Sequence, residues 1–295
     1  MKIKKALITA AGFGTRFLPI TKTIQKEMLP ILNRPIIDYV VDDLVKAGVE
    51  EIVFVISEHN IQLLHYYREN KRLYNYLKRM GKVDLYERVA NLHTKAKFTF
   101  IRQPDDAPYG TAVPVLFAKE HLVKEEAFFV FMGDDFLFNA NGFSESQAML
   151  KLFQASGASG VMACVKKPKS QISRYGVVKM REINGHRYLD SIVEKPPVEK
   201  APSNLVNISK YILTPKIFEI LDKQGPNPDS GELYITDTVT TLAQQEKVAI
   251  YTPKGYYLDG GNPAEWLKAN LTVAYHQPEI WEKVKKHLDR LNSKF

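Results

Sequence analysis

The stretch ALITAAGFGTR, residues 6–16, decides the fold class. Its first five residues form a short apolar run that ends at Gly12 and Gly14, the pattern of a buried strand followed by a tight glycine turn. Residues 36–45 then show apolar positions at helical spacing, and residues 51–56 form a second β-branched run. A strand, a helix and a strand in this order predict a βαβ unit, and therefore a parallel sheet with a right-handed crossover.

The rest of the chain continues to alternate between strand and helix patterns. Residues 127–132 are apolar without alternation, as in a central strand covered on both faces, and they end in Gly133-Asp134-Asp135. Further patterns predict strands at residues 97–102, 175–180, 188–194, 206–213, 247–252 and 256–258, and helices at residues 61–89, 111–121, 216–221, 232–245 and 263–291. We expect an α/β fold with a Rossmann-like, mixed but mostly parallel central sheet flanked by helices, in one domain spanning residues 1–295.

Composition narrows the classes of function. The chain has 295 residues, 45% of them apolar and 25% charged, which excludes disordered, collagen-like and low-complexity proteins. The single Cys164 excludes an intramolecular disulfide, and no apolar run reaches the roughly 18 residues of a membrane helix. The start at Met1–Lys5 leads into a strand and not into a signal peptide, so we expect a cytoplasmic protein without a membrane partner. The formal charge of +8 fits either nucleic acid or phosphorylated metabolites.

The glycine loop favours phosphorylated metabolites. Two glycines after a buried strand let the backbone approach a ligand and aim amide groups at phosphate oxygens, and Arg16 and Lys26 add positive charge. The loop lacks the third glycine of a dinucleotide fingerprint, and it is not a Walker loop. A cationic glycine loop beside a strand that ends in aspartate therefore predicts a nucleoside triphosphate site with a divalent ion.

Two aspartates are the candidate metal ligands. Asp134 and Asp259 each follow a predicted strand and each lie beside a glycine, whereas the orientation of the neighbouring Asp135 is open. Carboxylates and phosphates need a cation between them, and Mg²⁺ binds through one or two carboxylates together with substrate phosphates. We therefore expect a Mg²⁺ site at these two residues.

A series of motifs gives the chain a family resemblance. The motifs appear in the order AAGFGTRFLP (10–19), KEMLP (26–30), RQ (102–103), GDD (133–135), YGVV (175–178), VEKP (193–196) and DGGNP (259–263). Over residues 3 to 277 the chain resembles the prokaryotic UTP:glucose-1-phosphate uridylyltransferases, a group of sugar-1-phosphate nucleotidyltransferases with a glycosyltransferase-A-like fold. The resemblance implies a nucleotide-binding half at about 1–165, a sugar-phosphate-binding half at about 166–262 and C-terminal helices at about 263–295.

The resemblance also implies a role for each matching residue. Catalytic roles fall on Arg16 and Lys26. Nucleotide binding falls on Ala11, Gly12, Gly14, Thr15, Arg16, Lys26, Gln103 and Gly110, with the Gln103 amide placed to read the pyrimidine ring. Sugar-phosphate binding falls on Gly176, Glu194 and Lys195, and metal binding falls on Asp134 and Asp259. The implied reaction is uridylyl transfer from UTP to glucose 1-phosphate, which gives UDP-glucose and pyrophosphate by Mg²⁺-assisted in-line displacement.

Three departures from the family pattern leave the details open. Gln25 stands where relatives usually have proline, which predicts a less rigid loop. Thr111 stands where many relatives have histidine, which leaves the choice of base open. Ser209 stands where relatives commonly have glycine, which leaves the shape of the sugar pocket open. The alternatives are the same chemistry with dTTP or another hexose 1-phosphate, and a non-catalytic nucleotide-sugar sensor. The intact set of Arg16, Lys26, Asp134 and Asp259 argues against a sensor.

Two expectations concern larger partners. The cations near the end of the chain, Lys283, Lys285, Lys286, His287 and Arg290, lie on a predicted helix without an aromatic stacking platform, so we expect a solvated or subunit-facing helix and no nucleic-acid partner. The family resemblance implies a homodimer or homotetramer, to which Trp266 and Trp281 could contribute a contact.

Overall fold

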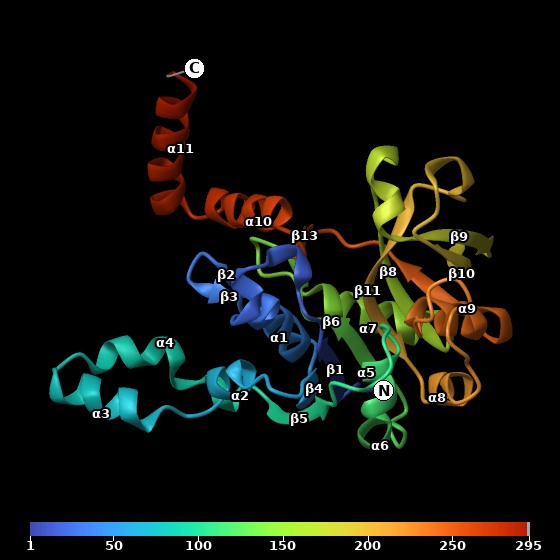
Figure 1. Ribbon diagram of the computed structural model, residues 1–295, viewed down its shortest axis with the longest axis horizontal. Helices are drawn as coiled ribbons and strands as arrows, with labels where there is room; N and C mark the ends of the chain where they lie inside the picture. The colour runs from blue at the N-terminus through green and yellow to red at the C-terminus, as the bar shows by residue number, and fades with distance from the viewer. Residues whose placement is uncertain (294–295) are drawn as a thin grey trace.

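The computed structural model describes residues 1–293, and within them nine strands form one mixed sheet (Figure 1). From one edge to the other the order is β5 (Lys97–Gln103), β4 (Glu51–Ser57), β1 (Lys5–Ala10), β6 (Phe128–Met132), β11 (Leu205–Leu213), β8 (Gly160–Lys166), β12 (Val248–Tyr251), β10 (His186–Glu194) and β9 (Gly176–Ile183). The pairings make β10 and β11 antiparallel to the other seven strands, which share one direction. The expected mostly parallel α/β sheet is confirmed.

Helices cover both faces of this sheet and enclose two apolar cores. One core lies between the sheet and the helices α1 (Ile36–Lys46) and α7 (Glu145–Ser156). The other core lies under α5 (Val113–Phe117), α6 (Lys119–Leu122), α8 (Lys216–Leu221) and α9 (Ile235–Gln245). Along β1, Ile8 enters the first core and Leu7 the second, because successive strand side chains point to opposite faces. This double coverage explains why the central strands read as continuous apolar runs.

Two small antiparallel pairs accompany the main sheet. The strands β2 (Pro30–Ile31) and β3 (Arg34–Pro35) form one pair. The strands β7 (Asp135–Phe138) and β13 (Tyr256–Asp259) form the other, and their register sets Asp135 opposite Asp259. Of these four strands only β13 was expected from the sequence, because the run at residues 127–132 was predicted to end at Gly133-Asp134-Asp135. The pair brings two candidate acidic segments together from sequence positions far apart.

The region between β4 and β5 is a helical insertion that projects from the body (Figure 1). The expected single helical stretch at residues 61–89 is wrong, because the chain forms α2 (Gln62–Tyr66), α3 (Lys71–Arg79), a 3₁₀ turn at Val83–Tyr86 and α4 (Glu87–Ala90). The side chain of Asn70 accepts a hydrogen bond from the Leu73 amide, 3.0 Å, and thereby starts α3 as a separate helix. Gly81, at φ +64°, ends it.

Two other helical expectations also split into shorter helices. Residues 111–121 form α5 and α6 with a break at Ala118, and residues 263–291 form α10 (Pro263–Tyr275) and α11 (Pro278–Asn292). Proline is favoured at the first position of a helix and disrupts a helix interior, so Pro278 starts α11 and separates it from α10. Residues 294 and 295 of the expected C-terminal segment lie outside the described residues. Among residues 1–293, no helix has the length and apolar character needed to cross a membrane.

Candidate active site

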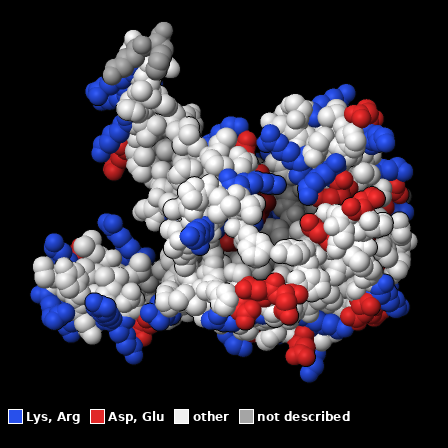
Figure 2. All heavy atoms as spheres, viewed as in Figure 1, with Lys and Arg blue, Asp and Glu red and all other residues white. Residues whose placement is uncertain are grey.

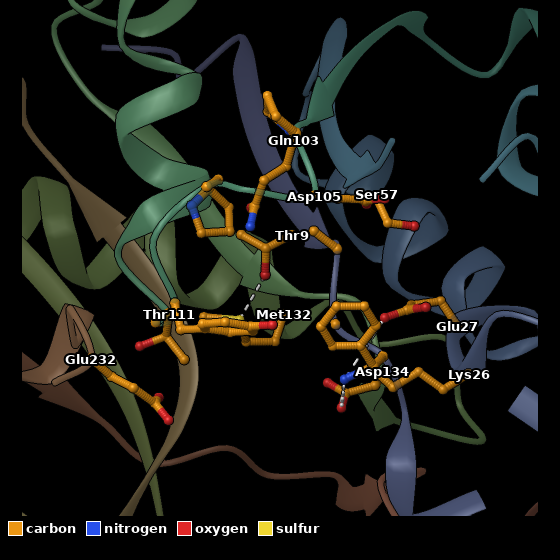
Figure 3. A pocket seen from close by; sticks show the side chains of 18 residues that line it. Thr9, Lys26, Glu27, Ser57, Gln103, Asp105, Thr111, Met132, Asp134 and Glu232 are labelled. Carbon is orange, nitrogen blue, oxygen red and sulfur yellow. Dashed lines mark hydrogen bonds and ion pairs between the residues drawn. The ribbon is translucent and has the colours of Figure 1, made fainter. Parts of the chain in front are cut away.

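A cavity of about 230 Å³ opens at the carboxyl ends of β1, β4, β5 and β6 (Figure 3). Carboxyl ends of parallel strands are the usual place for a ligand in an α/β sheet. Figure 2 shows that the molecule is hollowed in this region, with basic and acidic side chains around the hollow. Six residues selected from the sequence line the cavity: Ala11, Gly12, Lys26, Gln103, Gly110 and Asp134. The structure therefore brings together most of the residues predicted to bind the nucleotide.

The glycine loop between β1 and Lys26 forms one wall. Gly14 has φ +64°, a left-handed conformation that favours glycine, and its carbonyl accepts a hydrogen bond from Thr21 Oγ1, 2.8 Å. Thr15 and Arg16 lie in a 3₁₀ turn, Thr15–Phe17, outside the cavity lining. The Arg16 guanidinium instead reaches the loop after β13, since a Cβ built on Gly261 would lie 3.6 Å from its Nη1. Arg16 thus joins the glycine loop to the segment that carries Asp259.

Lys26 and Asp134 form an ion pair at the floor of the cavity, with 2.7 Å between Nζ and Oδ2 (Figure 3). Burial alone would lower the pKa of Lys26, but the charges of Asp134 and Glu27 raise it above its ordinary value. Burial alone would raise the pKa of Asp134, but the charge and hydrogen bond of Lys26 lower it. Lys26 is therefore a permanent cation beside the glycine loop.

Glu27 lies beside this pair and was not selected from the sequence. Glu27 is 1% exposed, its Oε1 lies 3.8 Å from Lys26 Nζ, and its Oε2 has no hydrogen-bond partner. Burial raises its pKa to about 7, with a further increase from the charge of Asp134 and a decrease from Lys26. Its place beside Lys26 in the KEMLP motif was the only sequence signal for it. Glu27 is thus a second carboxyl group that faces Lys26.

The opposite wall of the cavity carries the residue expected to read the base. Gln103 ends β5 and points into the cavity, and its buried Oε1 has no hydrogen-bond partner (Figure 3). Gly110 has φ +132°, and a Cβ there would lie 2.1 Å from the Leu233 carbonyl oxygen, so no side chain fits. Close packing of two backbones thus explains Gly110 independently of any ligand. The exposed rings of Phe13 and Tyr109, 6.2 Å apart, line the same cavity and were not selected from the sequence.

The three residues expected to bind the sugar phosphate lie together outside the cavity lining. Glu194 ends β10 opposite Gly176 of β9, and a Cβ on Gly176 would lie 3.0 Å from Glu194 Oε2. Thr236 Oγ1 donates to the same oxygen at 3.3 Å, and burial raises the pKa of Glu194. Lys195 has φ +44°, and its side chain is 53% exposed with Nζ 3.8 Å from Glu194 Oε1. Glu194 and Lys195 thus form an acidic and basic pair at the β10–β9 edge of the sheet, apart from the cavity.

The segments that carry Asp259 and Asp134 are joined by a backbone hydrogen bond. The Gly260 amide donates to the Asp134 carbonyl, 2.9 Å, and Asp259 Oδ1 accepts from the Gly261 amide, 2.6 Å. Burial raises the pKa of Asp259, and the charge of Asp134 raises it further while the Gly261 amide opposes the shift. Two carboxylates that repel each other form a donor set that suits a divalent cation. Asp135 turns to other partners, Lys210 and Tyr257, and burial raises its pKa to about 6 against the attraction of Lys210.

A second acidic group lies at the edge of the cavity. Glu58, His59 and Asp105 hold potential ligand atoms within 4.8 Å of one another, and His59 Nε2 lies 3.3 Å from Asp105 Oδ2. His59 and Asp105 are exposed. This group was not predicted from the sequence, because its members lie on two loops, far apart in the chain, that the pairing of β4 with β5 brings together.

Each of the three departures has a structural counterpart. Gln25 makes two hydrogen bonds. Its backbone amide donates to Gln62 Oε1 at 2.9 Å and its side-chain Nε2 donates to the Ala10 carbonyl at 3.2 Å, so the expected loss of rigidity is offset. Thr111 Oγ1 accepts from the Ile235 amide at 3.1 Å and anchors the start of α9. Ser209 has φ +52°, a left-handed conformation that would favour the glycine expected here from the family pattern.

Comparisons with known proteins agree with this geometry. The sequence model described as "Nucleotidyl transferase" matches residues 5–276. A UTP–glucose-1-phosphate uridylyltransferase of Staphylococcus epidermidis is 34% identical over 292 residues, 99% of each chain.

Solved structures extend the same comparison to three dimensions. A UDP-glucose pyrophosphorylase complexed with UDP-glucose is 34% identical with a TM-score of 0.80, over 94% of this chain and 99% of that one. A UTP-bound enzyme of this kind from Acinetobacter baumannii is 31% identical with a TM-score of 0.85, over 97% and 98% of the two chains. The chain therefore belongs to the nucleotidyl transferase family, among the UTP–glucose-1-phosphate uridylyltransferases.

Proposed function

We propose that this protein transfers the uridylyl group of UTP to glucose 1-phosphate and releases UDP-glucose and pyrophosphate. A phosphate oxygen of glucose 1-phosphate attacks the α-phosphorus of UTP, and the bond from that phosphorus to the bridging oxygen breaks in line. Pyrophosphate leaves with the electron pair of the broken bond. The reaction needs no covalent enzyme intermediate, so the protein's tasks are to align two anions and to balance their charge.

One observation supports the proposal most directly. The Lys26 cation, the glycine loop and the Gln103 side chain, whose Oε1 lacks a hydrogen-bond partner, all line one cavity. Lys26 would meet the α-phosphate, and its neighbours Gly12 and Gly14 would hold the triphosphate. Gln103 would present its buried amide to uracil, whose polar edge can satisfy the Oε1 that lacks a partner. An unsatisfied buried oxygen costs about 1–3 kcal/mol, and this favours a ligand that donates a hydrogen bond there.

Positive charge at the reacting phosphates would come from two side chains and a metal. Asp134 and Asp259 would hold Mg²⁺, whose chemistry when bound is to neutralise charge on phosphate oxygens. Their mutual repulsion supports this assignment, because a divalent cation removes it. Arg16, exposed beside the Asp259 loop, would contact the outer phosphates, and Lys26 would balance the charge that develops at the α-phosphate.

The sugar phosphate would bind across the gap at the ends of β9 and β10. A half-buried carboxylate such as Glu194 can accept hydrogen bonds from two hexose hydroxyls, and the adjacent Lys195 can pair with a phosphate. Gly176 keeps the space over Glu194 open, since a Cβ there would lie 3.0 Å from the carboxylate.

A pyrophosphate-release panel tests the proposed function. Four nucleotides, UTP, dTTP, CTP and ATP, are crossed with glucose, galactose, mannose and N-acetylglucosamine 1-phosphates, with and without Mg²⁺. We expect the highest kcat/KM with UTP and glucose 1-phosphate and a requirement for the metal. Tight UTP binding without pyrophosphate release from any pair would favour a nucleotide-sugar sensor, and a preference for dTTP would change the assigned base.

The compartment and the oligomer belong to the same proposal. We propose a cytoplasmic homodimer or homotetramer. In the described chain, Trp266 Nε1 donates to the Pro30 carbonyl at 2.9 Å, and Trp281 packs edge-on against Tyr275 with 5.1 Å between ring centroids. Both indoles thus already make contacts within the subunit. A contact with another subunit would use the parts of the two rings that remain exposed. Light scattering over a concentration series measures the oligomer number.

A further inference from the structure

Lys210 is a buried lysine in the middle of the sheet. It lies on β11, opposite Phe131 of β6, at the junction between the two halves of the sheet, and it is 1% exposed. Its Nζ donates to the Met132 carbonyl at 2.8 Å and forms an ion pair with Asp135 Oδ1. The other oxygen of Asp135 accepts from Tyr257 Oη at 2.9 Å. The ammonium is thereby tied to both β6 and β7.

The two hydrogen-bond partners of Lys210, Met132 and Asp135, lie on either side of Asp134 in the sequence. Met132 stands two residues before Asp134 and Asp135 stands one residue after it, so Lys210 holds both sides of the turn that carries this carboxylate. The remaining contacts of the turn fix it further, because the Gly133 amide donates to the Thr9 carbonyl at 3.1 Å and the Asp134 carbonyl accepts from Gly260 at 2.9 Å. Asp135 is also the register partner of Asp259. One ammonium therefore orients the segments of both proposed metal ligands.

An irregularity in β11 aims the Lys210 side chain at this turn. The pairing of β11 with β8 shifts register between Asn207 and Tyr211, and within the shift Ser209 has φ +52°. Asn207 Oδ1 accepts from the Ser209 amide at 2.9 Å and stabilises the irregular conformation. β-bulges commonly occur beside active sites, where they redirect a side chain. The left-handed conformation of Ser209 and the direction of the Lys210 side chain are thus parts of one local arrangement.

Stability alone is a weak reason for this arrangement. Burying an ion pair costs desolvation energy, and an apolar pair of similar volume is often equally stable. Two neighbours of Lys210, Tyr211 on β11 and Phe131 on β6, are buried aromatic residues. The pair is therefore placed where an apolar pair would pack, yet next to the residues that would hold the metal.

We propose that Lys210 is a positioning residue that sets the carboxylates of Asp134 and Asp259 toward a single divalent cation. The proposal rests on the proposed function, because it concerns the metal site of that reaction. Residues that orient metal ligands without touching the metal typically contribute about 10–100-fold to metal affinity. Lys210 contacts neither Asp134 nor Asp259 through its ammonium in the hydrogen bonds and ion pairs of the described residues.

The test measures how strongly Mg²⁺ tightens UTP binding, without any turnover. Titration calorimetry gives the Kd for UTP in EDTA and in saturating Mg²⁺, for the full chain and for Lys210→Arg, Lys210→Met and the double variant Lys210→Met/Asp135→Asn. The double variant removes the unpaired buried carboxylate that Lys210→Met would leave, so it stays folded if the single variant does not. Lys216→Met, which breaks the ion pair of Lys216 with Glu246 far from the turn, is the matched control.

We expect the Mg²⁺-dependent tightening to fall about tenfold or more in Lys210→Met and in the double variant, with the Kd in EDTA unchanged. Lys210→Arg should retain most of the tightening, because a guanidinium can reach the same two oxygens, and Lys216→Met should retain all of it. A folded double variant with normal tightening would overturn the positioning role and leave uridylyl transfer intact. If Mg²⁺ fails to tighten UTP binding to the natural chain, the metal site and the role of Lys210 both fall. The pyrophosphate panel judges the reaction itself separately.

Discussion

The nucleotide side and the sugar side of the proposed site differ in how far they are assembled. On the nucleotide side, Lys26 lies in a 3₁₀ turn, Lys26–Met28, whereas Asp134 follows β6 and Gln103 ends β5. The three residues meet on one cavity, with Lys26 and Asp134 already paired at 2.7 Å. On the sugar side, Glu194 and Lys195 are neighbours on one strand end, 3.8 Å apart, and the lysine side chain is more than half exposed. The nucleotide side is preorganised by the sheet, whereas the sugar side depends on local chain geometry.

This difference predicts unequal effects of mutation. A cation held in a low-dielectric cavity stabilises developing charge without reorganisation, so its loss affects the chemical step. An exposed ion pair is weakened by solvent and contributes little by itself, so its loss affects the binding of one substrate. Substitutions on the two sides should therefore separate into effects on kcat and effects on one KM.

The largest effect is expected for Lys26→Ala. Loss of this ammonium leaves Asp134 and Glu27 without their shared counter-charge and removes the cation proposed to meet the α-phosphate, so kcat should fall by at least about 10²–10³-fold. Steady-state pyrophosphate release measures kcat, and circular dichroism checks the fold. Lys283→Ala on exposed α11 is the control and should keep full activity. Near-normal turnover by a folded Lys26→Ala protein would remove Lys26 from the chemistry.

The next effect concerns the proposed metal ligands. Asp134→Asn and Asp259→Asn each keep the shape of the side chain but remove a negative charge, so the Mg²⁺ concentration for half-maximal activity should rise by about tenfold or more. A Mg²⁺ titration of the turnover rate measures it, with Asp229→Asn on an exposed loop as the control. An unchanged metal requirement in both variants would relocate the cation, and Glu58, His59 and Asp105 would be the next group to test.

On the sugar side, Glu194→Gln should act on one substrate alone. The amide keeps one acceptor oxygen but loses the charge-assisted hydrogen bonds to hexose hydroxyls, worth about 1.5–3 kcal/mol in total, so KM for glucose 1-phosphate should rise roughly 10–100-fold. KM for UTP should stay within about twofold, and exposed Glu199→Gln should change neither constant. An equal rise in both KM values would mean that Glu194 stabilises the whole cleft and does not contact the sugar.

The sequence predicted the sheet and one edge of the site well for a simple reason. Strand ends marked by glycine or aspartate, such as Gly12 and Asp134, must meet at the carboxyl edge of a parallel sheet, so their sharing of one cavity follows from local patterns. The separation of Arg16 from that cavity did not follow, because it depends on the direction of a 3₁₀ turn. The division of the chain at residues 165 and 262 stays a prediction, as do the roles assigned to the site residues.

Contacts that join distant segments were beyond the sequence. The strand β7 is four residues long and pairs with β13, more than one hundred residues later, so nothing near Asp135 indicates it. Lys210 read as part of an apolar strand, and its ion pair with Asp135 appears only once β11 packs beside β6. Glu27 was visible in its motif, but its burial was not, because burial depends on the close approach of Gly133, where a Cβ would lie 3.0 Å from Glu27 Cγ.

The smallest effect on activity, and the clearest on stability, is expected for Glu27→Gln. The two sides each contain a buried carboxylate with a raised pKa, but only Glu27 has an oxygen without a partner, and its pKa is about 7 against an ordinary 4.5. The folded protein thus binds the Glu27 proton more tightly than the unfolded chain does. Its contribution to stability is present in full below about pH 4.5 and is lost as the pH rises through 7.

Over that range the loss amounts to roughly 3–4 kcal/mol, because the pKa difference of 2.5 corresponds to about 1.4 kcal/mol for each unit. Glu27→Gln cannot ionise, so its free energy of unfolding should exceed that of the natural chain at pH 8 and approach it at pH 5. Urea unfolding at both pH values measures the difference, and Glu194→Gln should show a smaller one because Thr236 already binds its carboxylate. A Glu27→Gln curve parallel to that of the natural chain would show that Glu27 stays ionised across this range, held by Lys26.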